Sequence, residues 1–314
     1  MPTRIEDLDP VIAQVLEMGK GQPALETLSV ADARANMLMR VELLKPFAPQ
    51  GVETEDLSVA TGAGPLPIRI YRPAGVAGPL PVVVWLHGGG WVLGNIETHD
   101  NVCRFLAEFG PLLVVSVDYR LAPEAKAPAQ VQDTLAALDW AAAHAAAHGG
   151  DPARLVVGGD SAGGNLAALA ALATRGRGPK LAGQLLVYPV TDYPADAHAS
   201  YAENADFGLT REGMEWFWAH WLADGAGPDA TTAPLRAPDL SGLPPAYVVT
   251  SSHDVLRDEG KAYAGRLAEA GVLDSLDHVE GTIHGFFSMG GLAPVATETL
   301  KRAAVWAANV KAVA

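Results

Sequence analysis

Short apolar runs alternate with longer helical segments from about residue 80 to the end of the chain. Five runs are almost wholly apolar and short enough to be strands, at 82–86, 112–117, 155–157, 185–188 and 247–250, and a weaker one follows at 276–279. Runs that are apolar on both faces predict strands buried on both sides, as in parallel sheets. Helical periodicity fills the gaps, at 103–109, 130–148, 165–175, 259–270 and 297–313. Strand alternating with helix predicts a doubly wound α/β sheet.

The first part of the chain has a different pattern. Residues 10–18 form one amphipathic segment, and 29–44 form another with Ser29 at the N-cap position and Asp32 in the capping-box position. Two alternating segments at 57–60 and 66–71, joined by a Gly-rich turn, predict an antiparallel hairpin. We expect the hairpin at one edge of the sheet, which makes the sheet mixed.

Residues 192–238 interrupt the alternation of strand and helix. This segment predicts no strand but an aromatic-rich helix, Met214-Glu-Trp-Phe-Trp-Ala-His-Trp-Leu. An insertion of this size must pack over the edge of the sheet, and we expect it to form a small cap together with the N-terminal helices. The expected organisation is therefore N-terminal helices over 1–50, a catalytic domain over 51–191 and 239–314, and a cap insertion over 192–238.

Composition and charge narrow the classes of partner. The 314 residues are 49% hydrophobic and 18% charged, which indicates a well-packed globule, and the net charge is −14. A polyanionic surface repels phosphate backbones and anionic lipids, so we expect neither nucleic acid nor membrane partners. The single cysteine, Cys103, permits no intramolecular disulfide and is expected to be a buried structural thiol. No signal peptide or membrane span is evident, so a cytoplasmic location is the default expectation.

The first candidate for chemistry is a serine between a predicted strand and a predicted helix. Gly159-Asp-Ser-Ala-Gly163 matches G-x-S-x-G, and Gly164 follows. Strand, sharp turn and helix are what a nucleophile elbow requires, because the serine hydroxyl must project from a cramped turn. The alternative, a phosphate-binding Gly-rich turn, would need a P-loop or dinucleotide pattern, and no G-x-x-x-x-G-K-[ST] sequence occurs here. Ser161 is therefore the predicted nucleophile.

A Gly-rich stretch after the first apolar run suits an oxyanion hole. His87-Gly-Gly-Gly-Trp91 directly follows the predicted strand at 82–86, and its glycines expose backbone N–H groups with no side chain in the way. The N–H groups of Gly88, Gly89 and Ala162 are the expected donors. The alternative is a plain flexible loop, which would explain neither the preceding strand nor the later serine motif.

A serine nucleophile needs a histidine base and an orienting acid, in the chain order serine, acid, histidine in this type of fold. Of the histidines beyond Ser161, His284 falls in the loop after the last predicted strand, where its imidazole can reach the strand ends. Asp254 lies in the turn after the strand at 247–250, at the carboxyl end of the sheet. Asp258, four residues later, is a weaker candidate because a carboxylate in the first turn of a helix is favoured by the helix dipole alone.

Taken together, these residues resemble the hormone-sensitive lipase family of bacterial esterases. The matching pieces are His87-Gly-Gly-Gly-Trp91, Asp118-Tyr-Arg-Leu-Ala-Pro-Glu124, Gly159-Asp-Ser-Ala-Gly-Gly164, Asp254-Val-Leu-Arg-Asp258 and His284-Gly-Phe286, which run in family order over roughly 55–290. The Gly-Asp-Ser-Ala-Gly form is typical of the subgroup named for that pentapeptide. Val255 departs from the family, in which many members have a proline after the acid that would preset the turn.

The resemblance implies an α/β-hydrolase fold, with a mostly parallel eight-stranded sheet flanked by helices and a small helical cap. It also implies carboxylic ester hydrolysis by a triad of Ser161, Asp254 and His284, for which no metal or organic cofactor is needed. His144 and His148 stand four apart, as metal ligands can, but lack the glutamate of H-E-x-x-H, so a polar helix face is favoured. Members of the family are often dimeric, so a homodimer is one alternative by analogy, whereas the sequence itself does not indicate the oligomeric state.

Bulky aromatic residues suggest a narrow substrate pocket and favour short-to-medium acyl esters over long triglycerides; they are Trp91, Phe207, Trp216 and Phe286. Two alternatives stay open. One is a non-catalytic small-ligand receptor on the same fold, such as the gibberellin receptors, which have lost the catalytic histidine. The other is a hydrolase of amides, carbamates or lactones, because the shape of the cap and pocket selects the leaving group.

Overall fold

The computed structural model describes residues 4–193 and 198–313 and contains the eight-stranded sheet that the apolar pattern predicts. In the described residues the strands are β1 (Val52–Thr61), β2 (Gly64–Pro73), β3 (Leu80–Leu86), β4 (Leu113–Val117), β5 (Gly150–Asp160), β6 (Gly183–Val187), β7 (Ala246–His253) and β8 (Leu273–Ile283). They are ordered β1-β2-β4-β3-β5-β6-β7-β8. The β1–β2 and β2–β4 pairs are antiparallel and the others parallel, so the mixed sheet with the hairpin at one edge is confirmed.

The helices that cover the sheet follow the predicted alternation. They are α3 (Asp100–Phe109), α4 (Ala129–His144), α5 (Ala162–Thr174), α8 (Arg257–Glu269) and α9 (Pro294–Ala308). Two predicted helix ends are wrong: a 3₁₀ turn over 145–148 continues α4, and α9 ends at Ala308, before the expected residue 313. The periodicity of apolar residues therefore predicts the positions of the long helices, whereas it does not predict where their last turns end.

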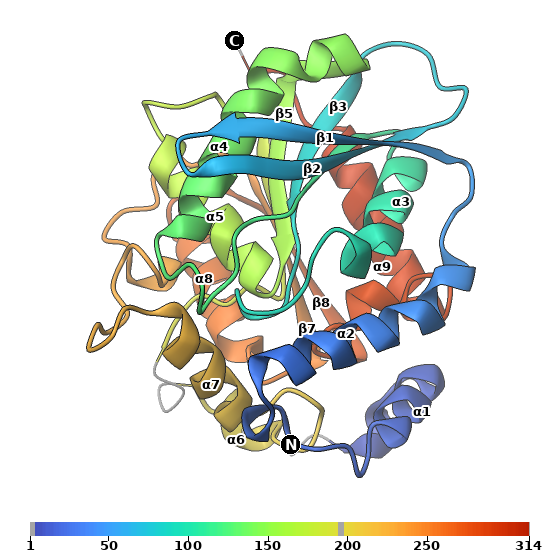
Figure 1. Ribbon diagram of the computed structural model, residues 1–314, viewed down its shortest axis with the longest axis vertical. Helices are drawn as coiled ribbons and strands as arrows, with labels where there is room; N and C mark the ends of the chain where they lie inside the picture. Colours follow the sequence, from blue (N-terminus) through green and yellow to red (C-terminus); the bar gives the residue numbers. More distant parts are fainter. Residues whose placement is uncertain (1–3, 194–197, 314) are drawn as a thin grey trace.

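Each central strand buries both of its faces, as the unbroken apolar runs predict. Along β3, Val82, Val84 and Leu86 pack with α4 and α5, whereas Val83 and Trp85 pack with α3 and α9. Figure 1 shows α3 and α9 on one side of the sheet and α4, α5 and α8 on the other. Cys103 is buried in the layer formed by α3, and burial raises the pKa of its thiol, as expected for a structural cysteine.

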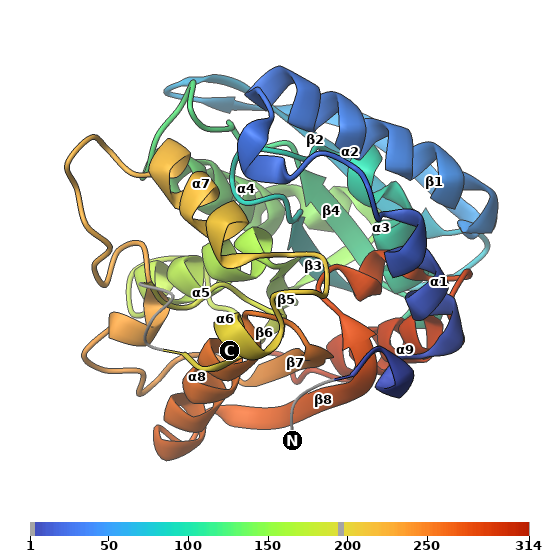
Figure 2. The same cartoon turned by 90° about the horizontal axis from the view of Figure 1, so that it is seen from below.

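Four further helices gather at one end of the molecule, at the bottom of Figure 1. They are α1 (Pro10–Met18), α2 (Val30–Leu44), α6 (Ser200–Glu203) and α7 (Arg211–Trp221), and Figure 2 looks onto them in front of the strands. The Ser29 hydroxyl accepts a hydrogen bond from the Asp32 N–H at 3.1 Å, which confirms the predicted cap of α2. In the described part of the chain, no helix is both long and apolar enough to cross a membrane.

Candidate active site

The three residues that the sequence selects for catalysis lie in one hydrogen-bonded line. Ser161 follows β5, Asp254 follows β7 and His284 follows β8. The His284 Nδ1 lies 2.7 Å from Asp254 Oδ2, and its Nε2 lies 2.9 Å from Ser161 Oγ. Because an ionised carboxylate only accepts hydrogen bonds, Nδ1 carries the proton and leaves Nε2 free to accept from the serine hydroxyl. This is the tautomer that a histidine base requires.

Ser161 lies on a turn with a strained backbone conformation, which contacts with neighbouring strands stabilise. Its φ is 56° and its ψ is −118°, a strained conformation for a residue with a Cβ. The Ser161 N–H donates to the Val187 carbonyl at 2.8 Å, which ties the turn to β6. A Cβ on Gly163 would come within 1.9 Å of the Leu86 carbonyl oxygen, and one on Gly159 within 2.5 Å of the same atom. Only glycines allow the turn to pack this closely against the end of β3.

The Gly-rich loop after β3 is fixed directly beside this turn by Asp160. The Gly88 N–H donates to Asp160 Oδ1 at 3.1 Å and lies 3.2 Å from His99 Nε2, and that nitrogen lies 3.3 Å from Asp160 Oδ2. The Gly88 N–H, one of the three expected oxyanion donors, is therefore already engaged. Within residues 4–193 and 198–313, the N–H groups of Gly89, Gly90 and Ala162 have no hydrogen-bond partner.

His87 holds the first residue of this loop in place. Its buried ring stacks on Tyr119 with centroids 4.2 Å apart, and its Nδ1 lies 2.8 Å from the Gly88 carbonyl oxygen. The Tyr119 hydroxyl donates to the His87 carbonyl at 2.7 Å. Burial lowers the pKa of His87 to about 3, so its imidazole is neutral at physiological pH and Nδ1 donates its hydrogen to the carbonyl. These buried contacts hold the start of the loop in one position.

The two acidic residues considered in the sequence have separate roles in the structure. The Asp254 side chain is fully shielded from solvent, and its Oδ1 accepts the Leu256 N–H at 2.9 Å while Oδ2 faces His284. Asp258 points elsewhere: it accepts the Ser200 N–H at 2.9 Å and pairs with Arg257 at 2.8 Å. The geometry accordingly favours Asp254 as the partner of the histidine.

Two of the four predicted pocket residues are packed in the core. Trp91 has no exposed surface and stacks on Trp221 with centroids 3.9 Å apart. Phe286 is equally buried and packs beside Tyr188, with centroids 5.8 Å apart. These two aromatic residues therefore support the walls of the site from behind rather than face a substrate.

The other two expected pocket residues belong to the segment between β6 and β7. Phe207 is almost fully buried and packs edge-on against His253, with centroids 4.7 Å apart. Trp216 is half-buried beside Phe217. A Cβ on Gly90 would come within 2.1 Å of the Phe217 ring, so this ring, which the sequence did not single out, lies against the Gly-rich loop.

Tyr188 is a second aromatic residue that the sequence did not single out. Its ring lies 4.7 Å from that of His284, and it stands at the end of β6, next to the strand that carries Ser161. The apolar run at 185–188 by itself predicts only a strand. Its position at the carboxyl end of a parallel strand was the signal that could have found it.

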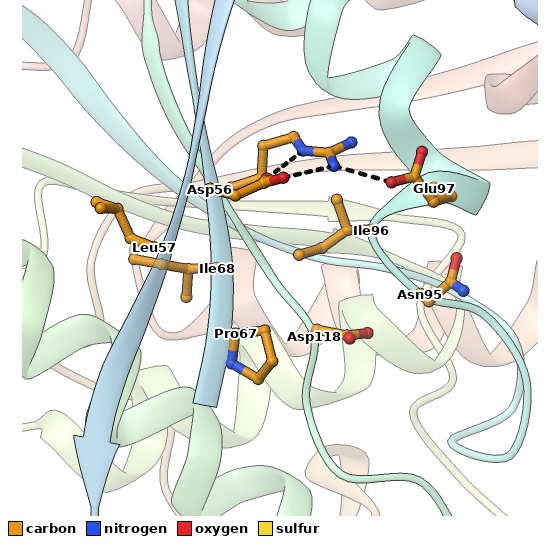
Figure 3. A pocket seen from close by; sticks show the side chains of 9 residues that line it. Asp56, Leu57, Pro67, Ile68, Asn95, Ile96, Glu97 and Asp118 are labelled. Carbon is orange, nitrogen blue, oxygen red and sulfur yellow. Dashed lines mark hydrogen bonds and ion pairs between the residues drawn. The ribbon is translucent and has the colours of Figure 1, made fainter. Parts of the chain in front are cut away.

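A separate cavity of about 250 Å³ lies against the β1–β2 hairpin (Figure 3). It is lined by Asp56, Leu57, Pro67, Ile68, Arg69, Asn95, Ile96, Glu97 and Asp118, and none of the three aligned residues is among them. Within it, Arg69 pairs with Asp56 at 2.5 Å and with Glu97 at 2.8 Å. In the described parts of the chain, no three His, Cys, Asp or Glu side chains gather as metal ligands.

Comparison with known proteins finds relatives that share the α/β-hydrolase fold and are named as esterases. A family profile described as alpha/beta hydrolase fold matches residues 83–288. The carboxylesterase NlhH of Mycobacterium tuberculosis is 42% identical over 306 residues, covering 94% of each chain, and an ethyl acetate hydrolase of Pseudomonas putida is 34% identical, covering 93% of this chain and 96% of its own. The crystal structure of a thermostable esterase from Pseudomonas putida superposes with a TM-score of 0.89 at 36% identity, covering 97% of this chain and 99% of the other.

Proposed function

Because the chain belongs to the hormone-sensitive lipase family of α/β-hydrolases and is a serine carboxylesterase, we propose that Ser161, His284 and Asp254 are its catalytic triad. The observation that carries this proposal is the unbroken line of hydrogen bonds from Asp254 through His284 to Ser161. A non-catalytic receptor would not need this alignment.

The proposed reaction is a two-step acyl transfer. His284 Nε2 takes the hydroxyl proton as Ser161 Oγ attacks the ester carbonyl, and Asp254 orients and stabilises the imidazolium that forms. The imidazolium then gives its proton to the leaving alcohol, and the acyl group remains on Ser161. In the second step His284 takes a proton from water as the hydroxide attacks the acyl-enzyme, and the imidazolium then gives this proton to Ser161 Oγ as its bond to the acyl group breaks and the acid leaves.

The proposed oxyanion hole consists of the N–H groups of Gly89, Gly90 and Ala162. Their support is that all three are unpartnered in the described residues. Ala162 directly follows Ser161 at the first position of α5, and Gly89 and Gly90 directly follow Gly88, which is bonded to Asp160. Gly88, which the sequence grouped with Gly89 and Ala162, is assigned a different role here. Its N–H donates to Asp160, so it fixes the loop instead of holding the substrate oxygen.

Substitution of the nucleophile tests the triad. The Ser161→Ala variant should lose at least about 10³-fold in kcat on a chromogenic acetate ester and should no longer react with a fluorophosphonate probe, since no nucleophile remains. Turnover close to that of the unsubstituted enzyme would refute the assignment.

The proposed substrates are short-to-medium acyl esters. Aromatic residues crowd the site, since Phe217 lies against Gly90 and Tyr188 beside His284, and a relative is named for the hydrolysis of ethyl acetate. The test is a series of p-nitrophenyl esters from acetate to palmitate. We expect the highest kcat/KM at the short end, and a maximum at palmitate would contradict the proposal.

We propose that the segments 1–50 and 192–238 form the cap over this site. Support comes from the position of their helices at one end of the molecule (Figure 1) and from Arg34 of α2, which donates to the Val92 carbonyl at 2.9 Å and pairs with Glu124 at 2.8 Å. Four further features stay predictions: the boundaries of the domains, membership of the Gly-Asp-Ser-Ala-Gly subgroup, a homodimer and a cytoplasmic location.

A further inference from the structure

We propose that α6 of the cap insertion, together with Asn204 directly after it, is a clamp that positions the acid of the triad through the side chains of Ser200 and Asn204. The inference rests on the proposed function in one respect, namely that Asp254 is the catalytic acid. It assigns to two cap residues a positioning role in catalysis, and it couples the placement of the cap to the alignment of the triad.

The need for a clamp arises from the turn that carries Asp254. The Arg257 N–H donates to the Asp254 carbonyl at 3.1 Å, which makes 254–257 a β-turn, and Leu256 has φ −84° and ψ 0°, the values of the third residue of a type I turn. The second position of such a turn favours proline, whose ring presets φ. Here that position is Val255, so this turn lacks the restraint that a proline would supply.

Side chains of the cap insertion supply a restraint from outside the turn. The Ser200 hydroxyl donates to the Val255 carbonyl at 2.6 Å, and the Asn204 amide donates to the Asp254 carbonyl at 2.9 Å. Ser200 and Asn204 are fully buried, and Asp254 and Val255 are only 1% exposed. Two successive carbonyl groups of the acid turn are therefore held by buried donors, and water cannot easily replace such donors if they are removed.

Further contacts of α6 are made to the same part of the chain. The Ser200 N–H donates to Asp258 at 2.9 Å, Glu203 pairs with Arg257 at 2.6 Å, and the Tyr201 hydroxyl donates to the buried Glu259 at 3.1 Å. This short helix thus binds the acid turn and the first turn of α8 as one unit. A displacement of α6 would carry the Asp254 carboxylate away from His284, because the turn and the helix are linked at several points.

The expected consequence is a requirement for α6 in the chemical step and not in substrate binding. Ser200→Ala and Asn204→Ala should each lower kcat by about tenfold, less than the ~10²-fold that a misplacement of 1 Å can cost. The KM for p-nitrophenyl acetate should stay within about twofold of its original value, since neither residue is proposed to touch the substrate. Circular dichroism and urea unfolding verify that each variant is folded at the assay temperature.

The rescue experiment uses the missing proline. The Val255 N–H has no hydrogen-bond partner in the described residues, so Val255→Pro removes no bond and restrains the turn from within. In the Val255→Pro background, Ser200→Ala should lower kcat by less than about threefold, and the difference between the two backgrounds is the coupling of a double-mutant cycle. A structural defect elsewhere would not be corrected by a proline in this turn.

Thr174→Val is the matched control, because it also removes a buried hydroxyl that donates to a backbone carbonyl, that of Ala170 at 2.9 Å. It lies at the far end of α5 from Ser161, and its kcat should not change. Folded Ser200→Ala and Asn204→Ala variants with unchanged kcat would overturn the clamp, as would an equal loss in the Val255→Pro background. Failure of the triad itself is distinguishable, since Ser161→Ala would then retain activity whatever the clamp variants do.

Discussion

The stability of the protein should depend on the protonation of one buried carboxyl group, that of Glu259. The side chain has no exposed surface and faces three donors: the N–H groups of Thr191 at 2.8 Å and Asp192 at 3.3 Å, and the Tyr201 hydroxyl at 3.1 Å. Burial raises the pKa of Glu259 from 4.5 to about 8, in spite of these donors. The folded protein therefore retains this proton over a pH range in which the unfolded chain has released it.

The sign and size of the effect follow from proton linkage. Between about pH 4.5 and pH 8 the folded state binds one proton more than the unfolded state at Glu259, so the free energy of unfolding falls as pH rises. One pKa unit corresponds to about 1.4 kcal/mol, which gives roughly 5 kcal/mol over the whole range. From about pH 6 to about pH 8 the loss is about 2 kcal/mol, since half of the Glu259 side chains are ionised at the upper end.

The substitution that isolates this effect is Glu259→Gln, which keeps the shape of the side chain and cannot titrate. Urea unfolding at about pH 6 and about pH 8 gives the free energy of unfolding of both proteins. Relative to the unsubstituted protein, the variant should gain about 2 kcal/mol between the two pH values. Glu215→Gln, on the exposed side of α7, controls for the loss of a surface charge. A difference between the two proteins that does not change with pH would refute the reasoning.

Two further predictions concern the site and its cap. Gly163→Ala should lower kcat/KM by at least about 10²-fold, because the new methyl group would collide with the Leu86 carbonyl; circular dichroism checks that the variant is folded. Arg34→Ala should lower the free energy of unfolding by about 1–3 kcal/mol, measured in urea, since it leaves the Val92 carbonyl and Glu124 without their donor.

The sheet and the triad could be predicted because local signals specify them. A strand buried on both faces has an apolar run that no other strand type shows, and the motifs around Ser161 and Asp254 stand shortly after such runs. His284 instead follows β8, an edge strand that is partly exposed and has a weaker apolar pattern. The ends of helices are set by weaker signals. For α9 the helix stops at Ala308 although apolar residues continue, because Asn309 closes it and the following residues run along the surface beside Ala153.

Other features of the site depend on contacts between distant segments and could not be predicted from the sequence. The bond from Gly88 to Asp160 joins residues 72 positions apart, and without it Gly88 and Gly90 are equivalent as candidate donors. The position of Trp91 also depends on a distant contact. Its size favours a pocket wall, but its ring stacks on Trp221 in the core. Side-chain type indicates what a residue can do, and only packing decides which residue does it.

The topology of the sheet explains why the proposed base, His284, stands on a loop. Ser161 follows β5 and Asp254 follows β7, with β6 between them, and His284 follows the edge strand β8. Neighbouring strands lie about 4.8 Å apart, so β8 is roughly 14 Å from β5, farther than a side chain on a strand can reach. The imidazole must cross two strands toward the serine, and the chain makes this possible by turning immediately afterwards at Gly285, with φ +82°. Asp254, on the strand beside β8, then lies behind the imidazole, where a bond to Nδ1 aims Nε2 at Ser161. The acid must therefore stay fixed relative to a histidine that reaches across from the sheet edge, and for this reason the restraint on its turn matters.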